Sequence, residues 1–151
     1  MWTMIGLLIL IAPCSVLIHE CGHALTAWIH KAEYIYLHLG IGPKVWNVHT
    51  EHFQFQINLL FLVGAMALYE RKEAFSKAEQ AIISLAGPLA NGLAAGGGLV
   101  LYQWLPLPIV AMFIAFNGWL CVMNLIPYRV GSKRSDGYIT LQSIIGQQRS
   151  P

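Results

Sequence analysis

The chain has 151 residues, of which 56% are hydrophobic and only 11% are charged, whereas ordinary soluble domains carry about 25% charged residues. This balance excludes a typical soluble enzyme and indicates an integral membrane protein. The formal net charge is only +2 and the lysines and arginines are scattered, so the sequence argues against nucleic acid as a partner. The length predicts a single domain over residues 1–151.

The first membrane-length apolar run extends from Met4 to about Ile29, and Pro13 is expected to loosen its helix. This run contains the sequence His-Glu-Cys-Gly-His, beginning at His19. Two histidines four residues apart share one helix face, so both imidazoles can bind one zinc ion, and the glutamate beside the first is placed to take a proton from water. Because a carboxylate inside a membrane span is costly, its presence indicates a function.

The segment after the first span favours β-structure. Strand-forming residues dominate Lys31–Phe55, Gly40–Pro43 is typical of a turn, and the chain then alternates between polar and apolar residues. We expect strands or hairpins at the membrane surface, and an exposed edge near Phe53–Ile57 that accepts an extended peptide; plain structural strands are the alternative. Ile57–Tyr69 is too short for a helical span and predicts a re-entrant or interfacial piece. Glu70–Glu79 predicts a solvated linker or short surface helix.

Two further spans are predicted within Gln80–Tyr128, a stretch of 49 residues that contains no Asp, Glu, Lys or Arg. Aromatic and proline residues at Gln103–Pro108 mark the turn between them, and the third span runs from about Ile109 to Ile126. The second span is rich in small residues, in particular over Ala86–Gly92 and Gly96–Gly98. These residues favour close helix packing, with a flexible gate as the alternative.

The tail predicts a short amphipathic helix at the membrane, with apolar residues at helical spacing: Tyr138, Leu141, Ile144 and Ile145. With three spans, all nine lysines and arginines fall on one side, so we expect the N-terminus outside and the C-terminus in the cytoplasm. Asp136 is the only aspartate and follows the third span on that side. His19 and His23 lie in the half of the first helix nearer the same side, so the three side chains can meet at one depth.

A catalytic zinc ion needs three protein ligands and an open position. The metzincin pattern is absent, because Thr26 and Ile29 stand where it requires Gly and His. If the third ligand were a glutamate later in the chain, it would have to be Glu33 or Glu51. Neither belongs to a helical motif that would place its carboxylate beside the two histidines. Asp136 therefore has the better geometric case as the third ligand.

Several motifs together resemble the site-2 protease family of intramembrane zinc metalloproteases. They are His19–His23 in the first span, Ala86–Asn91 in the second, and Asn124–Pro127 followed by Asp136–Gly137; Gly40–Pro43 also resembles the family's glycine-rich segment. The resemblance extends from about residue 5 to residue 137. It departs from the family pattern in the loop before the aspartate, which is longer here.

The resemblance implies an all-α membrane protein with a small β element: three transmembrane helices, a membrane-surface β-hairpin or re-entrant segment between helices 1 and 2, and a C-terminal amphipathic helix. It implies one zinc ion per chain, held by His19, His23 and Asp136, with Glu20 activating water. Asn124 would bind the substrate backbone or the developing oxyanion, a contact between helices being the alternative.

The implied activity is hydrolysis of peptide bonds in or next to transmembrane segments of membrane proteins or membrane-associated peptides. The lipid bilayer, and by resemblance a bacterial plasma membrane, is the expected environment. One alternative is a catalytically silent membrane zinc protein that binds or sequesters a partner, which the intact Glu20 argues against. Another alternative is a zinc carrier. Transport would require a row of polar residues through the bilayer, which the second and third spans lack. Asn91 and Asn117 are predicted to form hydrogen bonds between helices.

Overall fold

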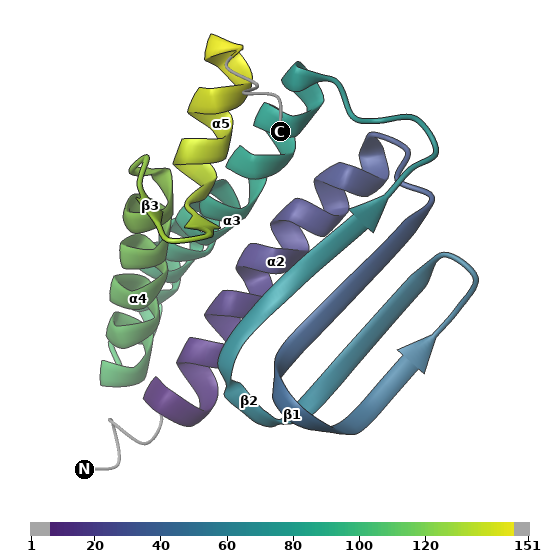
Figure 1. The fold of residues 1–151 in the computed structure, drawn as a ribbon. Coiled ribbons are helices and arrows are strands. Elements are labelled where there is room, and N and C mark those ends of the chain that lie inside the picture. The colour runs from purple at the N-terminus through teal and green to yellow at the C-terminus, as the bar shows by residue number, and fades with distance from the viewer. Residues whose placement is uncertain (1–6, 147–151) are drawn as a thin grey trace.

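The computed structural model describes residues 7–146. The elements are a π-helix η1 (Leu7–Ile11), helix α2 (Ala12–Ile29), strands β1 (Tyr34–His49) and β2 (Phe53–Glu70), helices α3 (Lys77–Trp104) and α4 (Pro108–Leu125), a small hairpin of β3 (Arg129–Val130) and β4 (Lys133–Arg134), and helix α5 (Asp136–Ile145). Figure 1 shows α2 between the sheet on one side and the other helices on the opposite side.

Three helices are long and apolar enough to cross a membrane, over Ile9–Ile29, Lys77–Trp104 and Pro108–Leu125. They confirm the three predicted spans, although the predicted start of the first at Met4 lies outside the described residues. The predicted turn between the second and third spans is also confirmed, because α3 ends at Trp104 and α4 begins at Pro108. The chain is therefore an integral membrane protein of the predicted fold class.

The first span changes from π-helix to α-helix just before Pro13. A proline has no N–H and its ring crowds the preceding turn, so the regular hydrogen-bond ladder cannot continue through it. The predicted loosening of the helix therefore takes the form of a π-helical turn. The regular part of α2 begins here and carries the motif residues.

Small residues bring the spans into close contact, as the sequence predicts. A Cβ atom at Gly22 of α2 would lie 2.5 Å from the carbonyl oxygen of Ala86 and 2.9 Å from Cβ of Ala90 on α3. One at Gly98 of α3 would lie 2.8 Å from Ile114 of α4. Helix α3 thus contacts α2 and α4 at glycines, and α5 also packs along it.

The sheet is more folded than a simple hairpin, because β1 and β2 both bend. Gly40 and Gly42 adopt φ values of +81° and +93°, which side chains disfavour, so strand β1 bends where the sequence predicted a turn. After it, Trp46 pairs with Ile57 and His49 with Gln54. The first half of β1 pairs on one side with residues 53–57 and on the other with residues 65–70. Four segments therefore lie side by side in the order 65–70, 34–39, 53–57 and 46–49 (Figure 1).

This order corrects one expectation. Phe53–Ile57 has a neighbouring strand on both sides, so it is not the exposed edge that the alternating pattern suggested. The alternation shows that a strand is half-buried but does not say which strands flank it. Ile57–Tyr69, predicted as a re-entrant or interfacial piece between the first two spans, takes the form of strand β2. Its last residues, 65–70, form the edge of the sheet that lies beside α2.

A short linker, residues 71–76, connects the sheet to α3. Arg71 donates from Nη1 to the carbonyl oxygen of His30 at 2.8 Å and binds both carboxylate oxygens of Glu79 at 3.0 and 3.1 Å. Ser76 caps α3 in a capping box with the same glutamate. These contacts fix the start of α3 against the end of α2. They therefore set how far the two helices beside the site are shifted along each other.

Candidate metal centre and catalytic site

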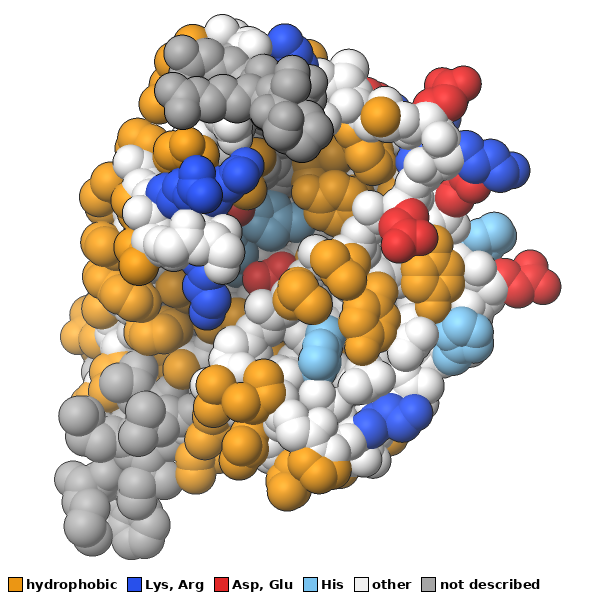
Figure 2. Space-filling model, viewed as in Figure 1, with side chains coloured by type: hydrophobic (Ala, Val, Ile, Leu, Met, Phe, Trp, Pro, Cys, Tyr) orange, Lys and Arg blue, Asp and Glu red, His pale blue; other side chains and the backbone are white. Residues whose placement is uncertain are grey.

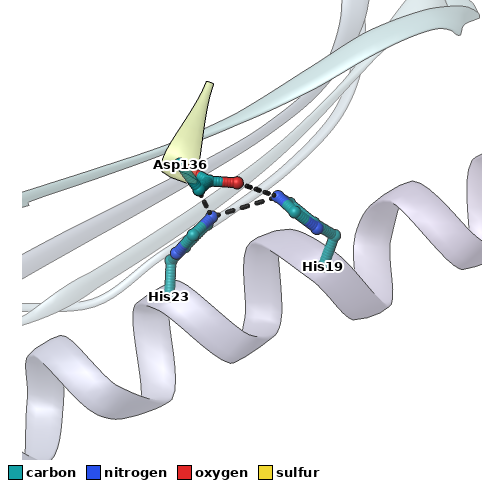
Figure 3. Close-up of side chains that lie close together, drawn as sticks. All are labelled: His19, His23 and Asp136. Atoms are coloured by element: carbon teal, nitrogen blue, oxygen red, sulfur yellow. Dashed lines mark hydrogen bonds and ion pairs between the residues drawn. The ribbon is translucent and has the colours of Figure 1, made fainter. Parts of the chain in front are cut away.

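Three side chains with metal-binding atoms converge beside α2. His19 and His23 project from its inner face, and Asp136 is the first residue of α5 (Figure 3). The two Nε2 atoms are 3.1 Å apart. Nε2 of His19 is 2.9 Å from Oδ2 of Asp136, and Nε2 of His23 is 3.4 Å from Oδ1. The structure therefore brings together the three predicted ligands.

The loop before Asp136 is closed by Ser135, which is only 3% exposed. Its hydroxyl accepts the N–H groups of Tyr128 at 3.0 Å and Tyr138 at 3.1 Å, and donates to the carbonyl oxygen of Ile126 at 2.8 Å. One side chain thus joins both ends of the loop and caps α5. The extra loop residues form the β3–β4 hairpin outside this closure, so the loop's length does not carry Asp136 away from α2.

Two glycines make room for the centre. A Cβ atom at Gly87 of α3 would overlap the imidazole of His23 and lie 2.8 Å from Nε2 of His19. A Cβ atom at Gly137 would overlap the carbonyl oxygen of Leu125 at the end of α4. The first glycine lets both imidazoles lie against α3, and the second lets α5 begin directly against the end of α4.

The hydrogen bonds of the imidazoles determine which nitrogens carry protons. Nδ1 of His23 lies 2.7 Å from the carbonyl oxygen of Ile83, which can only accept. Nδ1 of His19 lies 2.7 Å from Oδ1 of Asn91. Both Nδ1 atoms therefore donate, and both Nε2 atoms present lone pairs to the space near Asp136 when the rings are neutral.

The orientation of the Asn91 amide follows from its other contacts. Its Nδ2 donates to the carbonyl oxygen of Ser15 at 2.9 Å and to Oδ1 of Asn117 at 2.8 Å. Asn117 in turn donates to the hydroxyl of Ser15 at 2.8 Å and to the carbonyl oxygen of Phe113 at 2.9 Å. The predicted hydrogen bonds between helices are present, and they aim the oxygen of Asn91 at His19.

The donor set fits a zinc ion. Two imidazole lone pairs and a carboxylate would repel one another at 2.9–3.4 Å unless a cation or shared protons lay between them. A tetrahedral zinc ion with bonds of about 2.1 Å places its ligand atoms about 3.4 Å apart, and one ligand atom from each residue lies within 4.8 Å of the others. Burial would raise the pKa of the Asp136 carboxyl, but when no metal ion is bound, protons on Nε2 of His19 and His23 form hydrogen bonds to it that outweigh burial and hold that pKa below its usual range.

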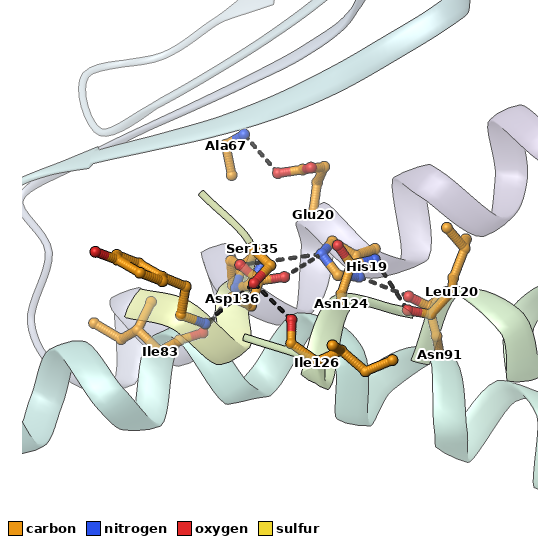
Figure 4. A network of polar contacts seen from close by, with 12 residues as sticks. His19, Glu20, Ala67, Ile83, Asn91, Leu120, Asn124, Ile126, Ser135 and Asp136 are labelled. Atoms are coloured by element: carbon orange, nitrogen blue, oxygen red, sulfur yellow. Dashed lines mark hydrogen bonds and ion pairs between the residues drawn. The ribbon is translucent and has the colours of Figure 1, made fainter. Parts of the chain in front are cut away.

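Glu20 and Asn124 line the same cavity of about 300 Å³ as the three ligands, together with Ala67 and Tyr69 of β2. Oε2 of Glu20 accepts the backbone N–H of Ala67 at 2.7 Å (Figure 4). Asn124 donates to the carbonyl oxygen of Leu120 at 2.9 Å, which uses only part of the hydrogen-bonding capacity of its amide. All five residues singled out in the sequence therefore surround one space.

Sequence reasoning missed the residues that support the centre: Gly87, Ser135, the backbone of Ala67, and the contact of Asn91 with a ligand. Some signals were available. Gly87 and Asn91 are four residues apart and therefore share one face of the second span, and a serine directly before an amphipathic helix is typical of an N-cap. No sequence signal identifies the N–H of Ala67, because its role depends on which strand lies at the edge.

Fold and site together have the arrangement of a membrane metalloprotease. The spanning helix α2 carries two histidines, α5 carries Asp136, and the carboxylate of Glu20 lies beside these three candidate ligands. The chain belongs to peptidase family M50, whose sequence profile matches residues 5–107; this confirms the resemblance to the site-2 protease family. It is 31% identical over 100 residues to a Thermotoga maritima protein named "Putative zinc metalloprotease", a match that covers 57% of this chain and 20% of that relative. The residues matched by the family profile include both histidines and Glu20, whereas Asp136 lies beyond them.

Replacing Asn91 with leucine should weaken zinc binding by about 10- to 100-fold, because the hydrogen bond that orients His19 is lost. Asn91→Asp keeps an acceptor oxygen but loses the amide donors to Ser15 and Asn117, so it should recover only part of the affinity. Competition with a chromophoric chelator in detergent measures the zinc affinity. Asn124→Leu is the matched control, since Asn124 lines the cavity without contacting a ligand, and it should bind zinc as the unaltered protein does. Equal affinities for the two leucine variants would show that Asn91 does not support the centre.

Proposed function

We propose that the protein is an intramembrane zinc endopeptidase that hydrolyses peptide bonds in or next to transmembrane segments of membrane proteins or membrane-associated peptides. The observation that carries this proposal is the shared cavity: it joins a three-residue ligand set to the carboxylate of Glu20. A structural zinc site uses four protein ligands, whereas three ligands beside a general base are typical of a catalytic one. The proposed environment is a bacterial plasma membrane.

Each residue has a distinct part in the proposed reaction. His19, His23 and Asp136 would hold the zinc ion, which when bound lowers the pKa of water from about 16 to about 7 and polarises a carbonyl group. Glu20 accepts the proton of the water whose oxygen bonds to the scissile carbonyl carbon. When the carbon–nitrogen bond breaks, Glu20 returns this proton to the leaving amine. Asn124 donates a hydrogen bond to the carbonyl oxygen as negative charge develops there.

The edge of the sheet offers a way to present the substrate. Ala67 lies opposite Leu37, but its N–H donates to Glu20 rather than to β1. Because backbone directions alternate along a strand, Ala65 and Tyr69 also direct their N–H and C=O groups away from β1 and toward the cavity. A substrate helix satisfies its own backbone hydrogen bonds and must unwind before it can be cleaved. An unwound segment could add as a strand at this edge.

The basic residues set the proposed orientation. Three spans place the β-sheet, the linker before α3 and the segment after α4 on the same side of the membrane. That side then carries all the lysines and arginines, as the positive-inside rule requires for the cytoplasm. We therefore assign the N-terminus to the outside and the C-terminus, with α5, to the cytoplasm.

Metal removal tests the proposed function. Purified protein in neutral phospholipid vesicles should cleave a single-span reporter peptide, lose this activity completely after chelation, and regain it when zinc is added back in stoichiometric amount. Circular dichroism before and after chelation reports whether the helices persist. Cleavage at an unchanged rate in the metal-free protein, verified by elemental analysis, would contradict the proposal.

A further inference from the structure

The β3–β4 hairpin carries a concentration of positive charge that its own fold does not explain. Arg129 lies directly opposite Arg134, and Lys133 is next to it, opposite Val130. Like charges that face each other across a strand pair destabilise it. All residues of the hairpin are exposed, so burial of apolar surface does not offset this repulsion. Such a local conflict in a short element is typical of a functional site.

The hairpin lies at the mouth of the catalytic cavity. Arg134 lines that cavity together with Glu20, Asn124 and Asp136. Its guanidinium donates to Oε1 of Gln142 at 3.1 Å and lies 5.9 Å from the ring centre of Tyr138, both on α5. Figure 2 shows blue side chains beside the hollow in which histidine and acidic side chains are visible.

The described residues do not neutralise the positive charge of the hairpin. Over residues 7–146, none of its three basic side chains forms an ion pair. A divalent cation held by the three ligands would balance the charges of Asp136 and Glu20, so the candidate metal centre does not need the basic side chains of the hairpin either. The described part of the chain therefore leaves a surplus of positive charge at the mouth of the cavity, which carboxylates of another molecule could balance.

We propose that Arg129, Lys133 and Arg134 select substrates that carry acidic residues next to the cleaved transmembrane segment, on the side of the membrane where the hairpin lies. This inference rests on the proposed function, since it assigns a substrate class to the same site. Anionic lipid headgroups would also be attracted to the hairpin. A substrate is favoured over lipid as the ligand because Arg134 lines the catalytic cavity. The scissile segment must pass Arg134 to reach the site.

Binding of three matched reporters tests the proposal independently of cleavage. Each reporter is a single-span peptide flanked on that side by three aspartates, three glutamines or three lysines, and its affinity is measured by fluorescence anisotropy in vesicles of neutral phosphatidylcholine. The Glu20→Gln background prevents turnover. The aspartate reporter should bind about fivefold more tightly than the glutamine reporter, the upper range for a partly exposed ion pair, and the preference should vanish in high salt.

Arg134→Glu combined with Arg129→Glu and Lys133→Glu reverses the charge of the hairpin and should exchange the order of the aspartate and lysine reporters, which a loss of folding cannot do. Lys44→Glu is the matched control: it lies in the bend before the outermost strand segment, at the far side of the sheet, and should leave the order unchanged. Equal binding of all three reporters would overturn the inference. So would a difference between the triple variant and the unaltered protein that arises only in anionic vesicles, since lipid would then be the ligand. Selective binding without cleavage in the Glu20-intact protein would contradict the proposed function alone.

Discussion

Glu20→Gln is expected to abolish cleavage of a membrane reporter while leaving zinc bound. Glutamine has the same shape, and its Oε1 can still accept the N–H of Ala67, but its amide cannot take a proton from water. Loss of a general base reduces the rate by about 10²- to 10⁴-fold. The three ligands are unaltered, so the zinc content measured by elemental analysis should stay at one ion per chain.

Glu51→Gln is the matched control, since Glu51 is exposed in the turn between β1 and β2 and takes no part in the site. It should cleave the reporter as the unaltered protein does. Full activity of Glu20→Gln would refute the proposed mechanism. A protein that binds its partner equally well with and without the Glu20 carboxylate, and cleaves in neither form, would instead be the catalytically silent zinc protein that the sequence left as the alternative.

Gly87→Ala should disrupt the metal centre although glycine itself binds nothing. The added Cβ belongs to the backbone of α3 and cannot rotate away from the imidazoles of His23 and His19. Either the rings or the helix must move, and overpacking of this kind costs about 1–3 kcal/mol. If this free energy destabilises the metal-bound form of the protein, zinc affinity should drop by about 5- to 150-fold, with a parallel loss of activity.

Gly96→Ala separates this effect from the general effect of a methyl group in α3. No atom lies within 4 Å of a Cβ at Gly96, so this variant should bind zinc and cleave the reporter normally. Chelator competition and reporter cleavage are measured on both variants, and thermal unfolding shows whether each is folded. Identical zinc affinities for the two alanine variants would mean that the space at Gly87 is not what the imidazoles need.

The parts of the protein that depend on local periodicity could be predicted from the sequence. Uninterrupted apolar runs identify helical spans, because the bilayer sets their length. Spacing of four residues on a helix places His19 and His23 together, and the topology of three spans places Asp136 on their side. These features follow from single elements or from their order along the chain.

The remainder depends on contacts between elements that no local pattern contains. Alternation in Phe53–Ile57 identifies a strand, but whether it lies at an edge depends on the bend at Gly40–Gly42 and on the segments that pair outside it. The importance of Gly87 depends on which residue of α3 lies opposite the histidines. The contact of Arg71 with Glu79 helps to set this alignment. The closing of the loop by Ser135 likewise appears only when α4 and α5 are side by side.

The hydrogen bond between Ala67 and Glu20 sets up a competition for one donor. A substrate strand added at the β2 edge would require the same N–H that now holds the Glu20 carboxylate. One backbone N–H cannot serve both acceptors at full strength. Arrival of the substrate would therefore untether the base at the moment when a peptide bond is in reach, whereas in the empty enzyme the base stays occupied. Docking and activation would then be a single event, and substrate itself would be the trigger.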